Sequence, residues 1–549
     1  MKLKKWISFA LAGAMCLSLA ACGDKATQTN LPLESSGNAT VKSVTLTENW
    51  DFASGFYPVI NHSNSANHGF VYWGRNFYDT LVAYDQEQKI QGALAETWEV
   101  SEDGKMYTFH LRKGIKFSDG TPLTADAVKQ SFSAAITNLG QANGSFGMLT
   151  KLIAQMQAPD ENTFVLQLTS PYYGTLNDLT MSTPLGVVNP RAFEGGEEKA
   201  YENCKTSTMG TGAYMYEGFD GTTYTFLRNP YYWGAKPELD RFQIKVIEDN
   251  DAKVLALRNG EIDLIIGASR ISYDGFTDLA TDGAFGNAIN KAPTLTRYLG
   301  MNLTTAPFDD QLVRQAVAYA VDQQALENSV FNGIESAAET LFAREKPYCD
   351  VKQTTYATDV EKAKTLMEQA GWMDTDGDGV REKNGKKLEI KISYTKSFST
   401  IDDAVLGIAS QLETIGFKVQ TSGSDMMSWF GDIMAGNYTL ALYFTYGGAF
   451  DPSTVMTNMD PAISADPIVI QFTPMIPGGV ELISELNSTP DFERVQAIYA
   501  QVLAEISNQC MAVPITYARE TAIWNNKLVS SYDFCPDAQY VNVAGIHLK

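Results

Sequence analysis

The sequence predicts an α/β protein of two or three domains, and three observations support this fold class. The chain is 549 residues long, which is more than a single hydrophobic core usually accounts for. Hydrophobic residues make up 44% of it and aromatic residues 11%, as in globular proteins with a large core. From about residue 297 onward, segments with helical periodicity alternate with segments that have strand periodicity, which is typical of a parallel sheet.

The first 21 residues have the pattern of a bacterial export signal. A start with three lysines precedes an apolar run over residues 7–20, which is too short and too rich in small residues for a membrane span. The run ends in Leu-Ala-Ala-Cys22, which resembles the cleavage box of bacterial lipoproteins. We therefore predict cleavage before Cys22, a lipid on its sulfur, and a location outside the cytoplasm at the cell surface or in the periplasm. The alternative is an ordinary secretory signal with a cysteine here by chance.

The chain after this signal opens with a polar stretch and is acidic as a whole. Residues 22–43 are rich in Ser, Thr, Asn and Gly and are predicted to form a flexible tether. The formal net charge of −22 argues against nucleic-acid binding, which needs a basic face. Such acidity favours cationic cargo, although solubility outside the cell explains it equally well. No later segment reaches about 18 consecutive apolar residues, so no further membrane span is predicted.

Four cysteines follow the predicted lipid site Cys22, at Cys204, Cys349, Cys510 and Cys535. They allow up to two disulfides in three pairings, and buried unpaired thiols are the equal alternative. None has the spacing of a zinc site, and the chain contains no GxSxG, HExxH or phosphate-loop motif. We therefore predict that the protein is not an enzyme and has no resident cofactor.

The first half begins with a strand, and residues 93–132 then form a predicted hairpin that leads into a helix. Asp103 and Gly104 make a turn signal, and the apolar residues that follow alternate along one face of a strand. Thr124 is suited to cap the next helix, whose apolar residues recur at helical spacing. His110 points away from the apolar face of the strand, so we assign it a structural role.

Residues 51–78 are crowded with aromatic and amide side chains and contain two of the chain's four histidines. His62 and His68 could share a metal ion in a loop. The alternative, that they are ordinary solvated histidines, is favoured because no third ligand stands at a fixed spacing. We also predict that Tyr72 and Trp73 of this stretch contact the ligand.

The second half alternates between predicted helices and strands. The helix over residues 312–321 has apolar residues at four-residue spacing on two adjoining faces and is predicted to be buried. Thr358 and Glu361 match a capping box at the start of another helix, which Gly371 ends. Further predicted elements are a strand at residues 388–394, a helix at 401–415, a strand at 438–444 and a final helix that starts at Thr489 and Pro490.

The sequence DTDGDG at residues 374–379 is similar to a calcium-binding loop. It has the glycine that such loops need at position 6, but position 12 is Gly385 where a glutamate is required. The loop also lies between a predicted helix and a strand instead of between two helices. A polar turn is therefore the favoured interpretation, and calcium binding is the alternative.

Residues 440–451, LALYFTYGGAFD, form the strongest candidate for a ligand site. A predicted strand leads here into Tyr446 and Phe450, two aromatic residues that flank Gly447 and Gly448. Glycine lets a ligand approach the backbone, and aromatic rings offer it flat faces. Ligands of α/β sheets bind near the carboxyl ends of strands, where this stretch falls. The alternative is a glycine-rich turn with two core aromatics.

Several motifs resemble one protein family over most of the chain. They are the hairpin and helix pattern of residues 93–132, MGTGAY at 209–214, RNPYYWG at 228–234, NGEIDL at 259–264 and the segment 302–316. Their pattern is similar to that of bacterial solute-binding protein family 5, whose members serve ABC importers for oligopeptides, dipeptides and nickel. The resemblance extends from about residue 44 to the C-terminus.

The resemblance implies the two-lobed fold of type II periplasmic binding proteins, in its large form with an extra subdomain. Cargo would bind in a cleft between the lobes, which would close on it by a hinge motion. The implied boundaries are residues 44–78, 199–295 and 515–549 for lobe I, 79–198 for the extra subdomain, 296–514 for lobe II, and hinge crossings near 290–298 and 512–518.

The same resemblance implies a role in transport. The protein would capture small-molecule cargo outside the cytoplasm and deliver it to the permease and ATPase subunits of an ABC importer. It would act as a monomer, contact the membrane only through its lipid anchor, and bind no nucleic acid.

The stretch at residues 440–452 also bears on the cargo. Peptide-binding members of the family have an acid three residues before an Asp-Pro pair, where it binds the α-amino group of the peptide. This chain has Gly448 at that position. The sequence TYGGAFDP instead resembles the nickel-type pattern Thr-Trp-Gly-x-x-Tyr-Asp-Pro, whose aromatics surround a metal–chelator complex. Tyr446 and Phe450 match those aromatics, and residues 339–348 carry a second likeness to the nickel type.

Two departures from the nickel type are present. Residues 182–188 lack the arginine that holds the carboxylate of the chelator, and residues 457–467 lack a histidine. A bound metal would then depend on His62 or His68, or on ligands that its own chelator supplies. We rank nickel or another metal chelate above a small peptide as cargo. The alternatives are peptide uptake or peptide-signal sensing and, after these, a surface enzyme.

Overall fold

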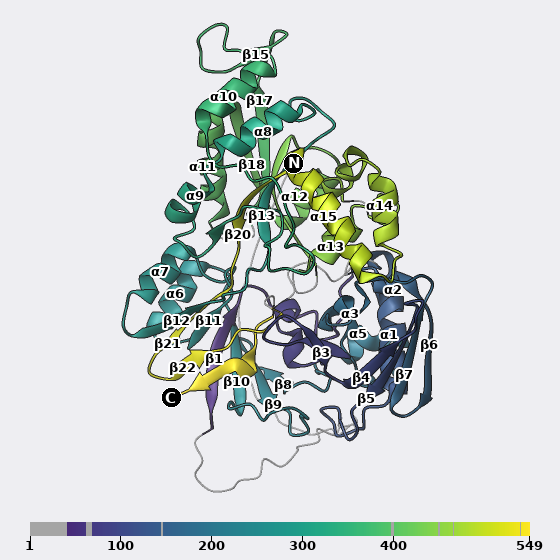
Figure 1. The fold of residues 1–549 in the computed structure, drawn as a ribbon. Coiled ribbons are helices and arrows are strands. Elements are labelled where there is room, and N and C mark those ends of the chain that lie inside the picture. Colours follow the sequence, from purple (N-terminus) through teal and green to yellow (C-terminus); the bar gives the residue numbers. More distant parts are fainter. Residues whose placement is uncertain are drawn as a thin grey trace, which may run out of the picture. The chain divides into compact units, whose positions relative to one another are not determined.

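A six-stranded mixed sheet organises the second half of the chain (Figure 1). Only β19, β17 and β18 pair in parallel, so the prediction of a parallel sheet is confirmed for these three strands. It is wrong for β13, which lies between β19 and β20 and is antiparallel to both, because the chain enters β13 from a neighbouring sheet and returns to that sheet after β20. In sheet order the strands are β14 (Ser336–Ala337), β20 (Ala512–Tyr517), β13 (Thr296–Met301), β19 (Leu440–Phe444), β17 (Glu389–Thr395) and β18 (Lys418–Ser424).

The computed structural model describes residues 41–61, 69–143, 147–396, 400–447, 451–464, 466–537 and 540–549. All of them belong to one contact unit that spans residues 41–549. None of the helices formed by these residues is long and apolar enough to cross a lipid bilayer.

Helices cover the parallel end of the six-stranded sheet. Both α11 and α12 pack against β17 and β18, and α8 packs on α10 beside them (Figure 1). The buried helix predicted over residues 312–321 is thereby confirmed as α8. The helices of this half are α8 (Gln311–Ala320), α9 (Gln323–Ser329), α10 (Val360–Gln369), α11 (Ile401–Glu413), α12 (Met426–Met434), α13 (Pro452–Thr457), α14 (Gly479–Leu486) and α15 (Phe492–Asn508).

Aspartates, rather than threonines, cap the helices whose starts the sequence placed slightly early. The predicted capping box at Thr358 is wrong, because Asp359 occupies the cap of α10 and accepts a hydrogen bond from the Lys362 amide at 2.9 Å. The Thr358 hydroxyl instead donates to the Val321 carbonyl at 3.4 Å. Asp491 caps α15 in the same way, two residues after the start that Thr489 suggested.

Three smaller sheets are formed mainly by the first half of the chain, and one of them includes a strand from near the C-terminus. One has the order β1 (Ser43–Glu48), β10 (Arg241–Val246), β9 (Thr223–Arg228), β8 (Tyr214–Phe219), and β1 joins it in parallel. The second contains β11 (Leu264–Ile266), β21 (Thr521–Asn525) and β12 (Phe285–Ile289). The third contains β4 (Ala95–Val100), β5 (Met106–Leu111), β7 (Thr163–Leu168) and β6 (Ile153–Asp160).

The predicted hairpin and helix are confirmed in the third sheet. β4 and β5 pair in antiparallel fashion, the alternating apolar residues of β5 are buried, and His110 is exposed. The Thr124 hydroxyl caps α1 by accepting a hydrogen bond from the Ala127 amide at 3.2 Å. The helices of this half are α1 (Ala125–Leu139), α2 (Leu149–Leu152), α3 (Thr175–Asp178), α4 (Ser182–Leu185), α5 (Ala200–Asn203), α6 (Asn250–Arg258) and α7 (Tyr273–Ala280).

The described residues also form three two-stranded ribbons. They are β2 (Val82–Tyr84) with β3 (Ile90–Gly92), β15 (Glu382–Lys383) with β16 (Lys386–Lys387), and β22 (Val529–Tyr532) with β23 (Ile546–Leu548).

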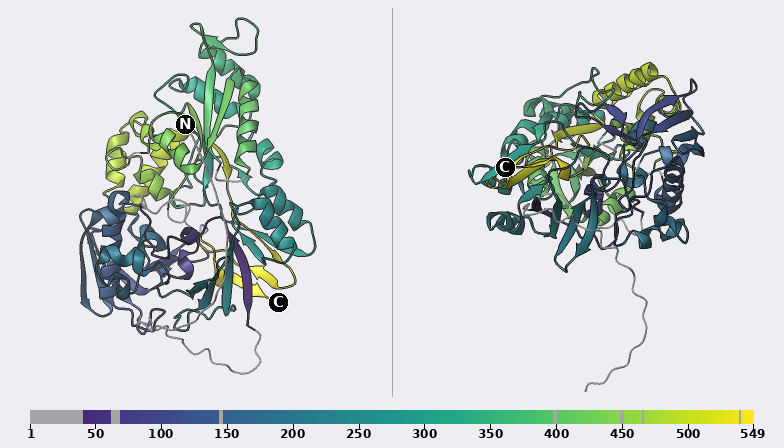
Figure 2. Two further views of the ribbon diagram at one scale, coloured as in Figure 1. Left: turned by 180° about the vertical axis from the view of Figure 1, so that it is seen from behind. Right: turned by 90° about the horizontal axis from the view of Figure 1, so that it is seen from below.

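Two chain segments cross between the three-stranded and the six-stranded sheet, where the sequence predicted hinge crossings. β12 continues into β13, and β20 continues into β21, as both Figure 1 and Figure 2 show. The crossings pair with each other: the Thr294 amide donates to the Ala518 carbonyl at 2.8 Å, and the Asn290 amide to the Glu520 carbonyl at 2.8 Å. The two strands of this ribbon are therefore held together through the crossing.

Buried apolar side chains gather around three of the sheets. One cluster surrounds the six-stranded sheet, a second surrounds the sheet of β1, β10, β9 and β8, and a third surrounds the sheet of β4 to β7. Cys204, Cys349, Cys510 and Cys535 are all buried as free thiols, which decides between the two alternatives left open by the sequence. The boundaries of the lobes stay a prediction.

Candidate functional site

The strand β19 delivers the predicted ligand motif to the end of the six-stranded sheet. Its last side chains are held by stacking, since the Trp429 ring of α12 lies 5.9 Å from the Phe444 ring with an interplanar angle of 21°. Beyond the strand, Thr445 bonds back to β13: its hydroxyl accepts from the Thr296 amide at 2.8 Å, and its amide donates to the Thr296 carbonyl at 2.9 Å. The backbone from which Tyr446 projects is therefore held against β13.

Tyr446 is partly buried and bound through its hydroxyl to an aspartate twenty residues further along the chain. The hydroxyl donates to Asp466 Oδ2 at 2.6 Å and accepts from Asn458 Nδ2 at 3.3 Å. Burial, and next the negative charge of Asp466, raise the pKa of Tyr446 well above its usual value. The hydroxyl therefore keeps its proton and stays in the hydrogen bond to Asp466.

Gly447 follows in a backbone conformation that only glycine adopts readily, with φ of 130°. A Cβ at this position would lie 2.6 Å from Thr454 Oγ1, so α13 packs directly against the backbone here. Asp451 then caps α13 by accepting a hydrogen bond from the Ser453 amide at 2.8 Å. The other two residues of the predicted motif, Gly448 and Phe450, lie outside the residues that the structure describes.

Tyr72 and Trp73 lie in a different part of the protein and are heavily engaged with neighbours. Trp73 is only 1% exposed, and its Nε1 donates to Glu48 Oε2 at 2.8 Å. The Tyr72 ring stacks on Trp50, with centroids 5.6 Å apart, and the Arg270 guanidinium lies 4.5 Å from its centroid.

The structure thus assigns Tyr72 and Tyr446 to separate surroundings. Tyr72 packs against the cluster around β1 and β10, and Tyr446 packs against the cluster around the six-stranded sheet. The role of Tyr72 and Trp73 as ligand contacts stays a prediction. His62 and His68, the predicted metal ligands, and Cys22, the predicted lipid site, lie outside the described residues.

Contacts between distant segments connect α3 and its surroundings to α13 and α15. Asn177 Nδ2 donates to Ser453 Oγ at 3.1 Å, next to the Asp451 cap. The hydroxyls of Tyr173 and Tyr499 lie 3.0 Å apart in a hydrogen bond. Tyr348 completes this group, because its ring lies 6.2 Å from that of Tyr173 and 5.1 Å from that of Tyr499.

A cavity of about 580 Å³ opens beside these contacts, within the usual size range of small-molecule sites. Asp451 and Ser453 form part of its wall, whereas Tyr446 does not line it. Aromatic rings form about a third of its lining. They come from the β2–β3 ribbon, the hairpin of β4 and β5, the segment before α3, the segment at Tyr348 and the start of α15, and they are those of Tyr84, Trp98, Tyr107, Tyr172, Tyr173, Tyr348 and Phe492.

Two carboxyl groups lie near this cavity, those of the buried Asp178 and the partly buried Asp451. Burial raises the pKa of Asp178 to about 7, and the charge of Asp451 adds to the rise, although the hydrogen bond from the Leu149 amide opposes it. Burial also raises the pKa of Asp451, while the positive charge of Lys346 lowers it. The surroundings of this cavity are therefore poorly suited to further negative charge.

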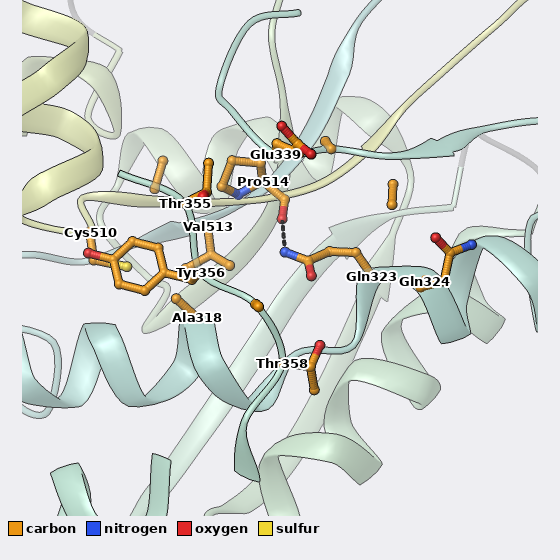
Figure 3. Close-up of a pocket in the computed structure, with 14 residues that line it drawn as sticks. Ala318, Gln323, Gln324, Glu339, Thr355, Tyr356, Thr358, Cys510, Val513 and Pro514 are labelled. Atoms are coloured by element: carbon orange, nitrogen blue, oxygen red, sulfur yellow. Dashed lines mark hydrogen bonds between the residues drawn. The ribbon is translucent and has the colours of Figure 1, made fainter. Parts of the chain in front are cut away.

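A smaller cavity of about 230 Å³ lies at the edge of β20 (Figure 3). Tyr356, Cys510 and Pro514 line it, and Gln323 Nε2 donates to the Pro514 carbonyl at 3.2 Å (Figure 3). Burial raises the pKa of the Cys510 thiol to about 12, so this thiol is not a reactive thiolate.

The DTDGDG turn collects acidic groups at the surface. The carboxylates of Asp374, Asp376, Asp378 and Glu382 all lie within 4.8 Å of one another. Lys387 already neutralises part of this charge, because its Nζ lies 3.5 Å from Asp376 and forms an ion pair with Asp378. This arrangement is a polar turn that a lysine closes, and calcium binding by the turn stays a prediction of the sequence.

Sequence reasoning missed Asp466 and Asn458, the two side chains that bind the Tyr446 hydroxyl. Both fall in residues 457–467, which drew notice only because they contain no histidine. No spacing rule connects an aspartate to a tyrosine twenty residues earlier when a helix and a turn lie between them. The single local signal was Asp466-Pro467, a common start of a turn.

Comparisons with known proteins agree with the family resemblance. A sequence model described as bacterial extracellular solute-binding proteins, family 5 Middle, matches residues 89–463. The nickel-binding periplasmic protein of Escherichia coli (strain K12) is 29% identical over 442 residues, which cover 80% of this chain and 83% of that protein. The oligopeptide-binding protein AppA of Bacillus subtilis (strain 168) is 27% identical over 359 residues, which cover 63% of this chain and 63% of that protein.

A solved structure matches the fold over nearly the whole chain. NikA from Brucella suis, crystallised in complex with Fe(III)-EDTA, has a TM-score of 0.84 and 25% sequence identity, and the match covers 92% of this chain and 100% of that one. The predicted two-lobed fold of type II binding proteins is thereby confirmed.

Proposed function

Because the chain belongs to family 5 of the bacterial extracellular solute-binding proteins, we propose that it captures nickel or another metal as a chelate and delivers it to an ABC importer. The permease and ATPase subunits of that importer are its partners. Members of this family bind solutes for transport and are not enzymes, in agreement with the sequence prediction. The cargo binds outside the cytoplasm, in the cleft between the two lobes.

One observation carries the choice of a metal chelate. The likeness to the nickel-binding relative extends over more of this chain than the likeness to the oligopeptide-binding relative. The motif at residues 445–452 supports the same choice, because it presents Tyr446 where the nickel type has an aromatic and has Gly448 in place of an acid. We propose that the complex lies over the rings of Tyr446 and Phe450, with Tyr72 and Trp73 further along the cleft.

A small peptide is the second candidate cargo, either for uptake or as a signal. It is favoured by the likeness to the oligopeptide-binding relative, which covers 63% of this chain. Asp466 would then offer a carboxylate near Tyr446, although Gly448 stands where peptide-binding members have theirs.

Isothermal titration of the purified protein decides between these cargos. We expect heat from nickel mixed with histidine and none from a library of dipeptides. Heat from dipeptides alone would transfer the assignment to peptide transport. His62→Ala and His68→Ala test the proposed metal ligands, because unchanged nickel affinity in both variants would leave the chelator as the source of the ligands.

We also propose that a lipid on Cys22 anchors the protein at the outer face of the cytoplasmic membrane. Labelled palmitate should be incorporated into the wild type and not into a Cys22→Ser variant. Equal labelling of both proteins would contradict the proposal that Cys22 carries the lipid. The acidic, tethered protein would act as a monomer, which light scattering on the purified chain measures.

A further inference from the structure

The carboxylate of Asp466 lies beneath the candidate site and is only 8% exposed. Oδ2 accepts hydrogen bonds from the hydroxyls of Tyr446 at 2.6 Å and Tyr443 at 3.1 Å. Oδ1 accepts from the amides of Ile468 at 2.9 Å and Val469 at 3.4 Å. Four donors thus hold the charged carboxylate in one orientation.

The described residues place no cation in an ion pair with this charge. Among the residues that the structure describes, no Lys, Arg or His lies within 4.0 Å of the Asp466 carboxylate, in contrast to the buried Glu48, which pairs with Arg270 at 2.6 Å. Neutral hydrogen-bond donors orient a carboxylate but leave its net charge in place. A buried charge acts over longer distances than a surface charge, because water and salt screen it less.

The hydrogen bonds of Tyr446 decide which part of this side chain a ligand can use. Its hydroxyl donates a hydrogen bond to Asp466, and its oxygen accepts one from Asn458. The hydroxyl therefore has no donor left for cargo, and the face of the ring remains. An aromatic face attracts cations through its quadrupole, and a carboxylate bound to the phenol oxygen makes the ring more electron-rich.

We propose that Asp466, acting through Tyr446, makes the cargo site selective for complexes that carry a net positive charge. This inference rests on the proposed function, since it places the cargo over Tyr446. The chemical class is a cationic metal chelate, or a ligand with an exposed ammonium group if the cargo is a peptide. Asp466 is then a positioning and specificity residue that compensates for the missing acid at Gly448.

The test varies the charge of the ligand and the charge of residue 466 separately. Asp466→Asn keeps the size of the side chain and an acceptor for Tyr446 but removes the charge. The probes are nickel with one equivalent of histidine, which is a monocation, and nickel–EDTA, which is a dianion. We expect the wild type to prefer the cation, and Asp466→Asn to bind it about tenfold more weakly while its affinity for nickel–EDTA does not fall.

Asp460→Asn is the matched control, because it removes the same charge six residues away from a carboxylate that bonds only the Ala462 amide in the described part of the chain. This variant should keep the wild-type preference. Equal losses of affinity for both nickel complexes in Asp466→Asn would assign Asp466 a merely structural role and overturn the proposal.

A measurement on the wild type alone guards against a variant that does not fold. The preference for the cation should persist when salt is raised to about 0.5 M, where the Debye length falls to a few ångströms and the surface charge is screened. A preference that disappears at high salt would come from the acidic surface and would overturn the proposal. If no nickel complex binds, a dipeptide and its N-acetylated form repeat the charge comparison, so failure of the metal assignment and failure of the charge selectivity remain distinguishable.

Discussion

At the scale of single residues, the candidate site depends on residues that are each held by two hydrogen bonds. Thr445 bonds to β13 through both its hydroxyl and its amide, and Tyr446 bonds to Asp466 and Asn458. A ring fixed in this way loses little conformational entropy when a ligand lies on it. The site is therefore organised before the cargo arrives, at least on the side of the six-stranded sheet.

Gly447→Ala should destabilise the protein and weaken cargo binding together. The backbone has φ of 130° here, and an added Cβ would lie 2.6 Å from Thr454 Oγ1. Strain of this kind costs roughly 1–3 kcal/mol. Urea unfolding measures the loss of stability, with Gly218→Ala as control, because a Cβ at that glycine meets nothing within 4 Å. Equal unfolding free energies in the two variants would contradict the expectation.

The residues of the site could be predicted only where the signal was local. Tyr446 and Gly447 were found because a strand, two aromatics and adjacent glycines follow one another within twelve positions. Asp466 was not found, because its partnership with Tyr446 exists only after α13 and the following turn have folded back on β19. Trp73 shows the opposite case, since an aromatic-rich stretch gave no sign that this ring lies against Phe242 in a core.

At the scale of elements, α3 and α13 meet near the carboxyl groups of Asp178 and Asp451. Asn177 on α3 donates to Ser453 on α13, and Asp178 and Asp451 influence each other's charge across this contact. Because burial raises the pKa of Asp178 to about 7, the folded protein holds this proton over a range in which the unfolded chain releases it. The contact therefore responds to pH near neutrality.

The sign of this response follows from the raised pKa. Asp178 contributes stability that is complete below the pKa of the unfolded chain, about 3.9, and that is lost as the pH rises through about 7. Between pH 5 and pH 8 the wild type should lose on the order of 2–4 kcal/mol from this group. In the Asp178→Asn variant residue 178 cannot titrate. The unfolding free energy of this variant should therefore fall less between pH 5 and pH 8 than that of the wild type, and the difference should equal the loss from Asp178.

Urea unfolding at the two pH values measures this difference. Asp126→Asn is the control, because it removes an aspartate that is exposed on α1 and should keep the pH dependence of the wild type. If Asp178→Asn and the wild type lose the same free energy between pH 5 and pH 8, the carboxyl group of Asp178 does not titrate in this range.

The elements themselves could be predicted well where one face is buried and poorly at their ends. Alternation at residues 107, 109 and 111 gave β5, and four-residue spacing gave α8. The start of α10 was misplaced because Thr358 fits the same rule as Asp359, and the choice between them depends on which side chain reaches the Lys362 amide. The direction of β13 and β20 depends on a sheet elsewhere in the chain, which no local pattern reports.

At the scale of the whole molecule, the contacts of Tyr173 connect segments that belong to different predicted lobes. Its hydroxyl bonds that of Tyr499 at 3.0 Å, more than 300 positions away in the sequence. Because this hydrogen bond connects the two predicted lobes, we expect it to belong to the state in which they are closed on cargo. A residue that stabilises only the closed state raises the apparent affinity for cargo without contacting it.

Tyr173→Phe should therefore weaken cargo binding about two- to fivefold, which corresponds to one hydrogen bond of roughly 0.5–1 kcal/mol. Titration calorimetry measures the affinity, and small-angle scattering should show a larger unliganded radius. Tyr356→Phe is the control, because its hydroxyl donates to the Ser507 carbonyl at 3.0 Å within the predicted lobe II. An equal effect of both substitutions would mean that Tyr173 does not report on closure.

The paired crossing of β12–β13 with β20–β21 limits how the two lobes can move. Amide groups of Asn290, Thr294 and Ala518 bond across it, so the two connections form one ribbon instead of two independent hinges. Bending such a ribbon out of its own plane preserves these hydrogen bonds, whereas sliding one strand past the other would break several at once. We therefore expect the predicted lobes to approach each other mainly by bending of this ribbon, so that different cargos are enclosed along the same arc.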